Sequence, residues 1–203
     1  AIRRQRQMCI RDRIMAILAL DMKARGTLKN NTVVGTIMSN LGFIRFCEAN
    51  DIRFSATKVG DRYVLEEMLL EDYVFGGEQS GHIIFKDFAT TGDGQLSAVQ
   101  LLAHIHRSGK KLAELKTVMT KYPQLIVNIR TTDAAKLAFY TDDDVRAILD
   151  EGKEKLGDRG RLVVRPSGTE PLIRIMAEGE DEAFTEAIAK QVAERIEEKL
   201  KVY

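Results

Sequence analysis

One short stretch, Arg165-Pro-Ser-Gly-Thr-Glu-Pro-Leu-Ile-Arg174, gathers the residue types best suited to hold a phosphate group. Each arginine offers a planar fork of donors that matches a phosphate edge. Proline stiffens both shoulders of the loop, and glycine lets consecutive backbone N–H groups converge on one anion. A β-turn with two solvated arginines is the simpler alternative. We predict a phosphate-binding loop formed by Arg165, Ser167, Gly168, Thr169 and Arg174.

A second loop, Gly76-Gly-Glu-Gln-Ser-Gly-His82, pairs a carboxylate with a hydroxyl. Glu78 and Ser80 are two residues apart, so both side chains project to the same side of an extended segment. Together they can accept and donate hydrogen bonds, which suits adjacent sugar hydroxyls or an amine. An ordinary glycine-rich hairpin turn explains these residues equally well. A single histidine such as His82, at the start of a strand, is more often structural than catalytic.

A third segment, Lys58-Val-Gly-Asp-Arg62, lies at an expected strand-to-helix turn, where α/β sheets usually meet their ligands. Lys58 and Arg62 can reach an anion there. For Asp61, capping the following helix is the simpler role. Lys58, Asp61 and Arg62 are therefore candidate substrate contacts.

Metal sites and catalytic residues are not expected in this sequence. The segment Thr90-Thr-Gly-Asp-Gly94 resembles a metal loop, but one carboxylate is too few for Mg²⁺ or Ca²⁺, so helix capping by Thr91 or Asp93 is favoured. His104 and His106 are two apart on an expected helix and face different ways. The sequence has no recognisable nucleophile turn, no aspartate-rich cluster that could hold a catalytic cation and no Walker-type or dinucleotide glycine loop.

The composition of the 203 residues is that of an ordinary soluble protein, with 44% hydrophobic and 30% charged residues. A net charge of +1 gives no general attraction to nucleic acid or to an anionic membrane. The arginine-rich start lacks the aromatic platforms of a nucleic-acid site. The two cysteines, Cys9 and Cys47, form no disulfide framework, and no apolar run is long enough to span a membrane. We therefore expect a cytoplasmic protein that binds neither nucleic acid nor a membrane.

Hydrophobic periodicity predicts an α/β protein of two domains. Residues 1–13 show no trustworthy period and are expected not to belong to the rest. Residues 14–121 alternate strands and helices around a mixed sheet, and residues 122–203 form a small β-α-β-β-α domain. The predicted helices are 14–25, 41–49, one from 61, one around 96–103, 142–156 and one from 181. The predicted strands are 32–38, 52–56, 73–75, 83–85, 124–130, 161–164 and 172–178.

From about residue 14 onwards the chain resembles the last two domains of the α-D-phosphohexomutase superfamily, in its phosphoglucosamine mutase branch. Besides the loops that contain Glu78 and Arg165, the resemblance rests on Val33-Val-Gly-Thr-Ile-Met-Ser-Asn40, Lys58-Val-Gly-Asp-Arg-Tyr-Val64 and Thr91-Gly-Asp-Gly94. The Met-Ser-Asn and Val-Gly-Asp-Arg-Tyr-Val segments resemble the corresponding segments of the glucosamine branch more than those of the other branches. We expect a phosphohexomutase domain III over 14–121 and a domain IV over 122–203.

The resemblance implies an isomerase that interconverts glucosamine 6-phosphate and glucosamine 1-phosphate through the 1,6-bisphosphate, for UDP-N-acetylglucosamine and peptidoglycan precursor synthesis. It implies that Glu78, Ser80 and His82 bind the sugar, while the Arg165–Arg174 loop binds phosphate. In the family, a phosphoserine in the first domain and a Mg²⁺ loop in the second carry out phosphoryl transfer. Neither loop is present in this sequence, so we expect substrate binding without turnover and no Mg²⁺ site. A phosphomannomutase or phosphoglucomutase fragment and a non-catalytic phosphosugar-binding module are the alternatives.

Overall fold

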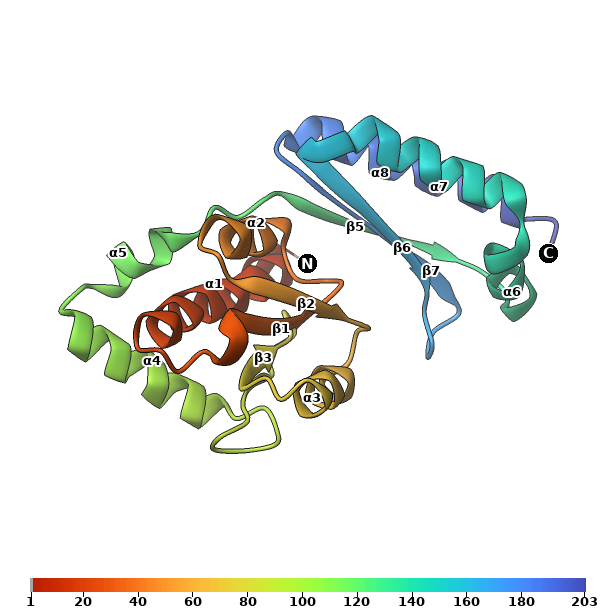
Figure 1. Cartoon of the computed structure of the whole chain (residues 1–203). Helices are drawn as coiled ribbons and strands as arrows, with labels where there is room; N and C mark the ends of the chain where they lie inside the picture. Colours follow the sequence, from red (N-terminus) through yellow and green to blue (C-terminus); the bar gives the residue numbers. More distant parts are fainter. Residues whose placement is uncertain (1) are drawn as a thin grey trace. The chain divides into compact units, whose positions relative to one another are not determined.

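A computed structural model of the chain describes the backbone of residues 2–203 and the side chains of residues 11–203 (Figure 1). The chain divides into two compact units, one ending at Lys121 and the other covering Tyr122–Tyr203. The alternation of helices and strands confirms the predicted α/β class. The elements of the first unit are α1 (Ile2–Ala24), η1 (Lys29–Asn31), β1 (Thr32–Thr36), α2 (Leu41–Ala49), β2 (Arg53–Thr57), α3 (Asp61–Leu70), β3 (Phe75–Gly77), β4 (Ile83–Phe85), α4 (Gly94–Ser108), α5 (Leu112–Leu115) and η2 (Lys116–Val118).

The first unit is built on a four-stranded mixed sheet in the order β2-β1-β3-β4. Strand β1 pairs in parallel with β2 and β3, and β4 runs antiparallel to β3. The continuous apolar run from Thr32 to Met38 predicts a buried parallel strand, and every residue of β1 is buried. Because β2, β1 and β3 run in the same direction, their carboxyl ends lie at one edge of the sheet. The loops that follow Thr57 and Gly77 therefore emerge at that edge.

Helices cover both faces of this sheet. The larger core cluster joins α1 and α2 to residues such as Val33 and Phe75, and the smaller one joins α3 to Val34 and Ile84. Alternate residues of one strand thus point into different cores, as the pleat of a strand requires. The apolar spacing of Val64, Met68 and Leu69 predicts that all three lie on the buried face of α3, but Leu69 has an exposed fraction of 56%, so the prediction is wrong for this residue.

Helix α1 begins at Ile2, well before the predicted start at Ile14, because the apolar period used for the prediction begins only there. Near the start of its described side chains, Asp12 is fully buried and accepts a hydrogen bond from the Asn40 backbone N–H at 2.8 Å. Farther along, Asp21 lies 2.7 Å from Arg107 and 2.9 Å from His104, both on α4. Burial alone would raise the pKa of Asp21. His104, Arg25 and Arg107 have the opposite and larger combined effect, so the pKa of Asp21 is lowered.

The second unit is a three-stranded antiparallel sheet in the order β5-β7-β6, with α7 and α8 side by side on one face (Figure 1). Ile173 and Ile175 of β7 point into the core, where they meet Ile188, Val192 and other residues of α8. The elements of this unit are β5 (Gln124–Arg130), α6 (Asp133–Thr141), α7 (Asp143–Leu156), η3 (Gly157–Arg159), β6 (Gly160–Pro166), β7 (Leu172–Gly179) and α8 (Glu182–Leu200).

Helix α6 was not predicted, so the second unit has one helix more than the expected β-α-β-β-α order. Thr132 caps it by accepting a hydrogen bond from Ala135 N at 3.1 Å. Its large side chains Leu137 and Tyr140 are exposed, with exposed fractions of 72% and 65%. Those exposed residues obscure the amphipathic pattern on which the prediction depended.

The described part of the chain bears on membrane association and on the reactivity of Cys47. None of the described helices is long and apolar enough to cross a membrane. Cys47 is a free, fully buried thiol, and burial raises its pKa to about 12, with Glu48 and Asp12 adding to the effect. A thiol in that environment is inert as a nucleophile. The side chain of Cys9 lies outside the described part of the chain.

Candidate functional site

The loop between β3 and β4 is tightly organised around Glu78. The Glu78 backbone N–H donates to His82 O at 2.8 Å, and the Gly81 N–H donates to Glu78 O at 3.1 Å. The Ser80 hydroxyl donates to Glu78 Oε2 at 2.9 Å, so the structure brings together the two side chains that the sequence spacing placed on one side. Glu78 is buried, whereas Ser80 and His82 are exposed. The carboxylate is therefore held in one orientation, with the hydroxyl beside it at the surface.

This loop is also tied to the turn between β2 and α3. The backbone N–H of Gly60 donates to Glu78 Oε1 at 2.7 Å. Gly60 has a φ of +136°, a conformation that side-chain-bearing residues rarely adopt, so glycine is required for this contact. In addition, His82 Nδ1 lies 3.2 Å from Asp61 Oδ2. The structure thus brings Glu78, Ser80, His82 and Asp61 together at the carboxyl edge of the sheet.

Lys58 and Arg62 surround the ring of Tyr63 at the same turn. Lys58 Nζ lies 6.0 Å and the Arg62 guanidinium carbon 5.0 Å from the ring centroid, which is cation–π distance. Arg62 Nε also pairs with Glu66 Oε1 at 3.2 Å. Lys58 is the more available of the two cations for a ligand, because among the described residues it forms no ion pair with a carboxylate, whereas Arg62 pairs with Glu66.

The capping predictions are partly correct. Asp93 caps α4, accepting hydrogen bonds from the backbone N–H groups of Gln95 and Leu96 at 2.8 and 3.0 Å. For α3 the prediction is wrong, because Gly60 is the capping residue and makes no side-chain bond. Asp61 is instead the first helical residue, and its carboxylate accepts from the Arg62 N–H at 2.9 Å. That shift leaves the second oxygen of Asp61 for His82.

A metal site was not expected, and the described side chains contain no group of three His, Cys, Asp or Glu residues placed to hold a metal ion. Of the two histidines of α4, His104 contacts Asp21, as described above. His106 faces solvent. Neither lies in the loop around Glu78.

The predicted phosphate loop is the turn between β6 and β7 in the second unit. The Ser167 N–H donates to Leu172 O at 2.8 Å, and Ser167 Oγ accepts from the Glu170 N–H at 3.2 Å, so the turn is closed by its own bonds. Ser167 is buried, while Gly168 and Thr169 are exposed at the tip. A Cβ at Gly168 would meet nothing within 4 Å, so an open space adjoins the backbone there.

The two arginines of this loop are direct partners across the β6–β7 hairpin. Their neighbours Val164, Ile173 and Ile175 pack into the core, so both arginines lie on the sheet face opposite α7 and α8. Like charges directly opposite one another in a sheet are destabilising. Burial and the charge of Arg174 lower the pKa of Arg165, which means that both disfavour its charge. The Nε atom of Arg165 is also buried without a hydrogen-bond partner.

Three residues of this region were not predicted. Asn128 of β5 is the register partner of Arg174, so it shares the face of the two arginines. Tyr140 of α6 is close enough to Arg165 to act on its charge. Glu170 forms an ion pair with Arg174. The period-2 pattern of β5 places Asn128 away from the core, but its neighbours depend on the strand order, which the sequence does not reveal.

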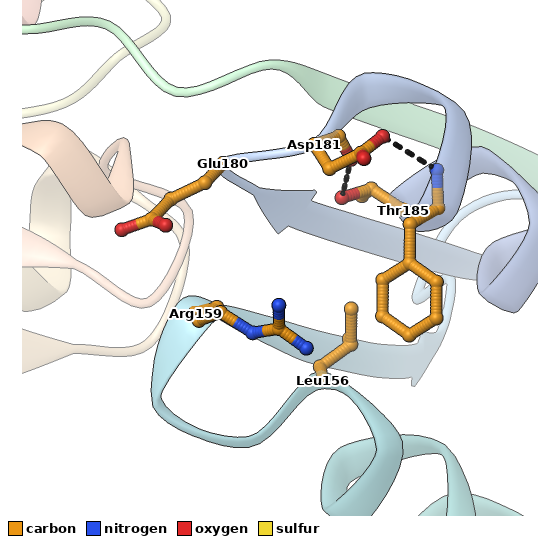
Figure 2. Close-up of a pocket in the computed structure, with 6 residues that line it drawn as sticks. Leu156, Arg159, Glu180, Asp181 and Thr185 are labelled. Atoms are coloured by element: carbon orange, nitrogen blue, oxygen red, sulfur yellow. Dashed lines mark hydrogen bonds between the residues drawn. The ribbon is translucent and has the colours of Figure 1, made fainter.

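The second unit also contains a hollow of about 200 Å³ beside the start of α8. Figure 2 shows Arg159 extending toward Leu156 near the start of α8. There the Phe184 N–H donates to Asp181 Oδ1 at 2.9 Å, and the Thr185 hydroxyl donates to Asp181 O at 2.6 Å. The guanidinium of Arg159 lies 6.0 Å from the ring centroid of Phe184. None of the predicted site residues lines this hollow. The four-residue spacing of Phe184, Ile188 and Val192 predicts that Phe184 packs against the sheet, and its exposed fraction of 40% shows that this prediction is wrong.

Comparison with known families gives matches along most of the chain. The model of the phosphoglucomutase/phosphomannomutase α/β/α domain III matches residues 11–122. The model of the phosphoglucomutase/phosphomannomutase C-terminal domain matches residues 126–195. Both candidate loops, around Glu78 and around Arg165, lie within these matches.

Curated relatives of the chain include bacterial phosphoglucosamine mutases. That of Caldanaerobacter subterraneus is 50% identical over 189 residues, which are 93% of this chain and 42% of the relative. That of an Arthrobacter species is 51% identical over 191 residues, which are 94% of this chain and 42% of the relative. The chain therefore spans about two fifths of the length of these relatives.

Solved structures with the same fold include an N-acetylphosphoglucosamine mutase from Aspergillus fumigatus, with a TM-score of 0.76 at 19% identity. The match covers 92% of this chain and 43% of that one. A phosphoglucomutase/phosphomannomutase family protein from Burkholderia thailandensis gives a TM-score of 0.73 at 18% identity, over 94% of this chain and 42% of that one. At these identities the likeness concerns the fold alone.

Proposed function

Because the chain belongs to the phosphoglucomutase/phosphomannomutase family, we propose that it is the substrate-binding part of a phosphoglucosamine mutase. The reaction is the interconversion of glucosamine 6-phosphate and glucosamine 1-phosphate through the 1,6-bisphosphate. The identity to phosphoglucosamine mutases supports this branch over the phosphomannomutases and phosphoglucomutases. The remaining machinery, a phosphoserine and a Mg²⁺ loop, would come from the other domains of such an enzyme, so this chain binds phosphosugar without turning it over.

The observation that carries the proposal is the opposition of Arg165 and Arg174 on the sheet face that α7 and α8 do not cover. Two guanidinium groups held side by side repel each other until an anion lies between them. A phosphate group supplies that anion and can accept bonds from both forks. The Ser167–Thr169 turn adds backbone N–H groups and a hydroxyl at the same place. Together, the two arginines and the three residues of this turn recognise a phosphate group, whichever sugar carbon bears it.

The loop around Glu78 performs the complementary task. Its carboxylate is oriented by Gly60 and Ser80 and stays beside an exposed hydroxyl, an arrangement that suits ring hydroxyls or the C2 ammonium of glucosamine. Further substrate contacts come from His82 of the same loop and from the turn before α3, which contributes Lys58, Asp61 and Arg62. Because the bisphosphate must bind in two orientations, a fixed carboxylate–hydroxyl pair and a phosphate site that is indifferent to position are both needed.

Calorimetric titration of glucosamine 6-phosphate into the chain tests this proposal. We expect weak binding, with a Kd of about 1 mM, and its loss in Arg165→Ala. Arg146→Ala is the matched control, because Arg146 is an exposed arginine of α7 paired with Asp143 at 3.1 Å. Glucose 6-phosphate in the same titration reports whether the C2 amine contributes. Equal binding by wild type and Arg165→Ala, or none by either, would contradict the proposal.

A further inference from the structure

The predicted phosphate loop contains an acidic residue, Glu170, which forms several of the hydrogen bonds within the loop. The Glu170 backbone N–H donates to Ser167 Oγ at 3.2 Å, and its carbonyl accepts from the Leu172 N–H at 2.8 Å. Its carboxylate accepts a hydrogen bond from Arg174 Nη2 and forms an ion pair with it. Backbone and side chain together fix the carboxylate at one of the two arginines that we assign to phosphate.

The two arginines are therefore not equivalent. Arg174 has a counter-charge from Glu170, whereas Arg165 has a buried Nε without a partner and no carboxylate contact recorded among the described residues. Without Glu170 the hairpin would present two positive charges. With it, the pair carries a net charge of about one, and one fork is partly occupied before any ligand arrives.

A bound phosphate would meet this carboxylate directly. An anion that bridges Arg165 and Arg174 must share the Arg174 fork with Glu170 and lie within a few ångströms of its negative charge. Like charges at that separation repel each other, most strongly at low ionic strength. Glu170 thus stabilises the empty loop and disfavours the occupied one.

We propose that Glu170 is an internal competitor that keeps the phosphate affinity of the loop low, so that a phosphosugar can leave and return in the opposite orientation. This inference rests on the proposed function, because it requires that Arg165 and Arg174 bind phosphate. It assigns Glu170 as a positioning residue that acts through Arg174. Its predicted signature is a gain of affinity on mutation, which damage to the loop would not produce.

The test is a titration of inorganic phosphate, followed by glucosamine 6-phosphate, into wild type and Glu170→Gln at low ionic strength. Glutamine keeps the size of the side chain and an oxygen for Arg174 but removes the charge. We expect phosphate to bind about two- to fivefold more tightly to Glu170→Gln, the range set by a partly exposed ion pair. The gain should shrink at about 0.5 M salt, where screening is short-ranged. Glu170→Ala, which also removes the acceptor oxygen, should show a gain of the same sign.

Glu186→Gln is the matched control. Glu186 on α8 forms an i,i+4 ion pair with Lys190 at 2.7 Å, and α8 covers the other face of the sheet. Its substitution removes the same charge from a similar pair and should leave phosphate affinity unchanged. If Glu186→Gln gained as much as Glu170→Gln, the effect would be one of overall charge, and the inference would be overturned.

The outcomes separate the inference from the proposed function. Equal or weaker phosphate binding by Glu170→Gln, together with loss of binding in Arg165→Ala, overturns the role of Glu170 and leaves the phosphate loop intact. Inorganic phosphate that binds to Glu170→Gln but not measurably to wild type, while glucosamine 6-phosphate binds to wild type, supports the role. No binding by wild type, Glu170→Gln or Glu170→Ala overturns both.

Discussion

The two candidate loops treat their charged side chains in opposite ways. Glu78 in the first unit is buried, and each of its oxygens accepts a hydrogen bond, from Gly60 N–H and from the Ser80 hydroxyl. Arg165 in the second unit lies beside another arginine and has a buried nitrogen without a partner. The first loop is satisfied without a ligand, while the second carries unbalanced charge that an anion would neutralise.

The two loops are therefore prepared for a ligand in different ways. A satisfied carboxylate contributes to the stability of the fold and offers a ligand a fixed surface. A pair of cations with a single counter-charge between them costs stability and offers a ligand binding energy. Substitutions in the first loop should therefore change mainly the free energy of unfolding, and substitutions in the second mainly the affinity.

The largest effect expected is on the stability of the first unit in Glu78→Ala. This change leaves the Gly60 N–H and the Ser80 hydroxyl without their acceptor and should lower the free energy of unfolding by about 1–3 kcal/mol. Urea unfolding followed through NMR signals of the first unit measures it. Glu48→Ala is the control, because Glu48 is an exposed glutamate of α2 paired with Arg45 at 3.0 Å, and it should cost less than about 0.5 kcal/mol. Equal losses would mean that the Glu78 bonds contribute nothing particular.

A smaller effect is expected on affinity in Asn128→Asp. The new carboxylate would stand opposite Arg174 and compete with phosphate for it, so phosphate affinity should fall about two- to tenfold. Titration with inorganic phosphate at low ionic strength measures the change. Gln191→Glu makes the same amide-to-carboxylate change on α8, where Gln191 accepts from Lys155 at 3.1 Å, and should have no effect. Unchanged affinity in Asn128→Asp would place the phosphate away from β5.

Much of this fold can be predicted from local patterns. The apolar run of β1, the caps at Asn40 and Asp93, and the amphipathic stripe of α8 all indicate structure through neighbours in the sequence. Helix α6 could not be predicted, because its exposed Leu137 and Tyr140 break the pattern. Short-range signals therefore recover the buried, periodic elements, whereas α6 is missed.

The sequence indicates which residues form the candidate loops, but it does not reveal most of the contacts between them. The spacing of Glu78 and Ser80 indicates that they share a side, and their hydrogen bond follows. The bond from Gly60 to Glu78 joins loops that are far apart in the sequence and needs the parallel order β2-β1-β3. Likewise, the opposition of Arg165 and Arg174 depends on the register of the hairpin, and the position of Asn128 depends on β5 pairing with β7. Tertiary pairing supplies these relations, and local propensity does not.

The smallest effect expected is on the stability of the second unit in Arg165→Met. Methionine keeps an unbranched apolar side chain while removing the charge that faces Arg174 and the buried Nε without a partner. The free energy of unfolding should stay constant or rise by up to about 0.5 kcal/mol, although phosphate binding is lost. Arg161→Met on the same strand is the contrasting control: Arg161 Nε donates to the buried Glu178 at 2.8 Å, and its loss should cost about 1.5–3 kcal/mol. Destabilisation by Arg165→Met on the scale of Arg161→Met would show that Arg165 is a structural residue, and the contrast between the two loops would disappear.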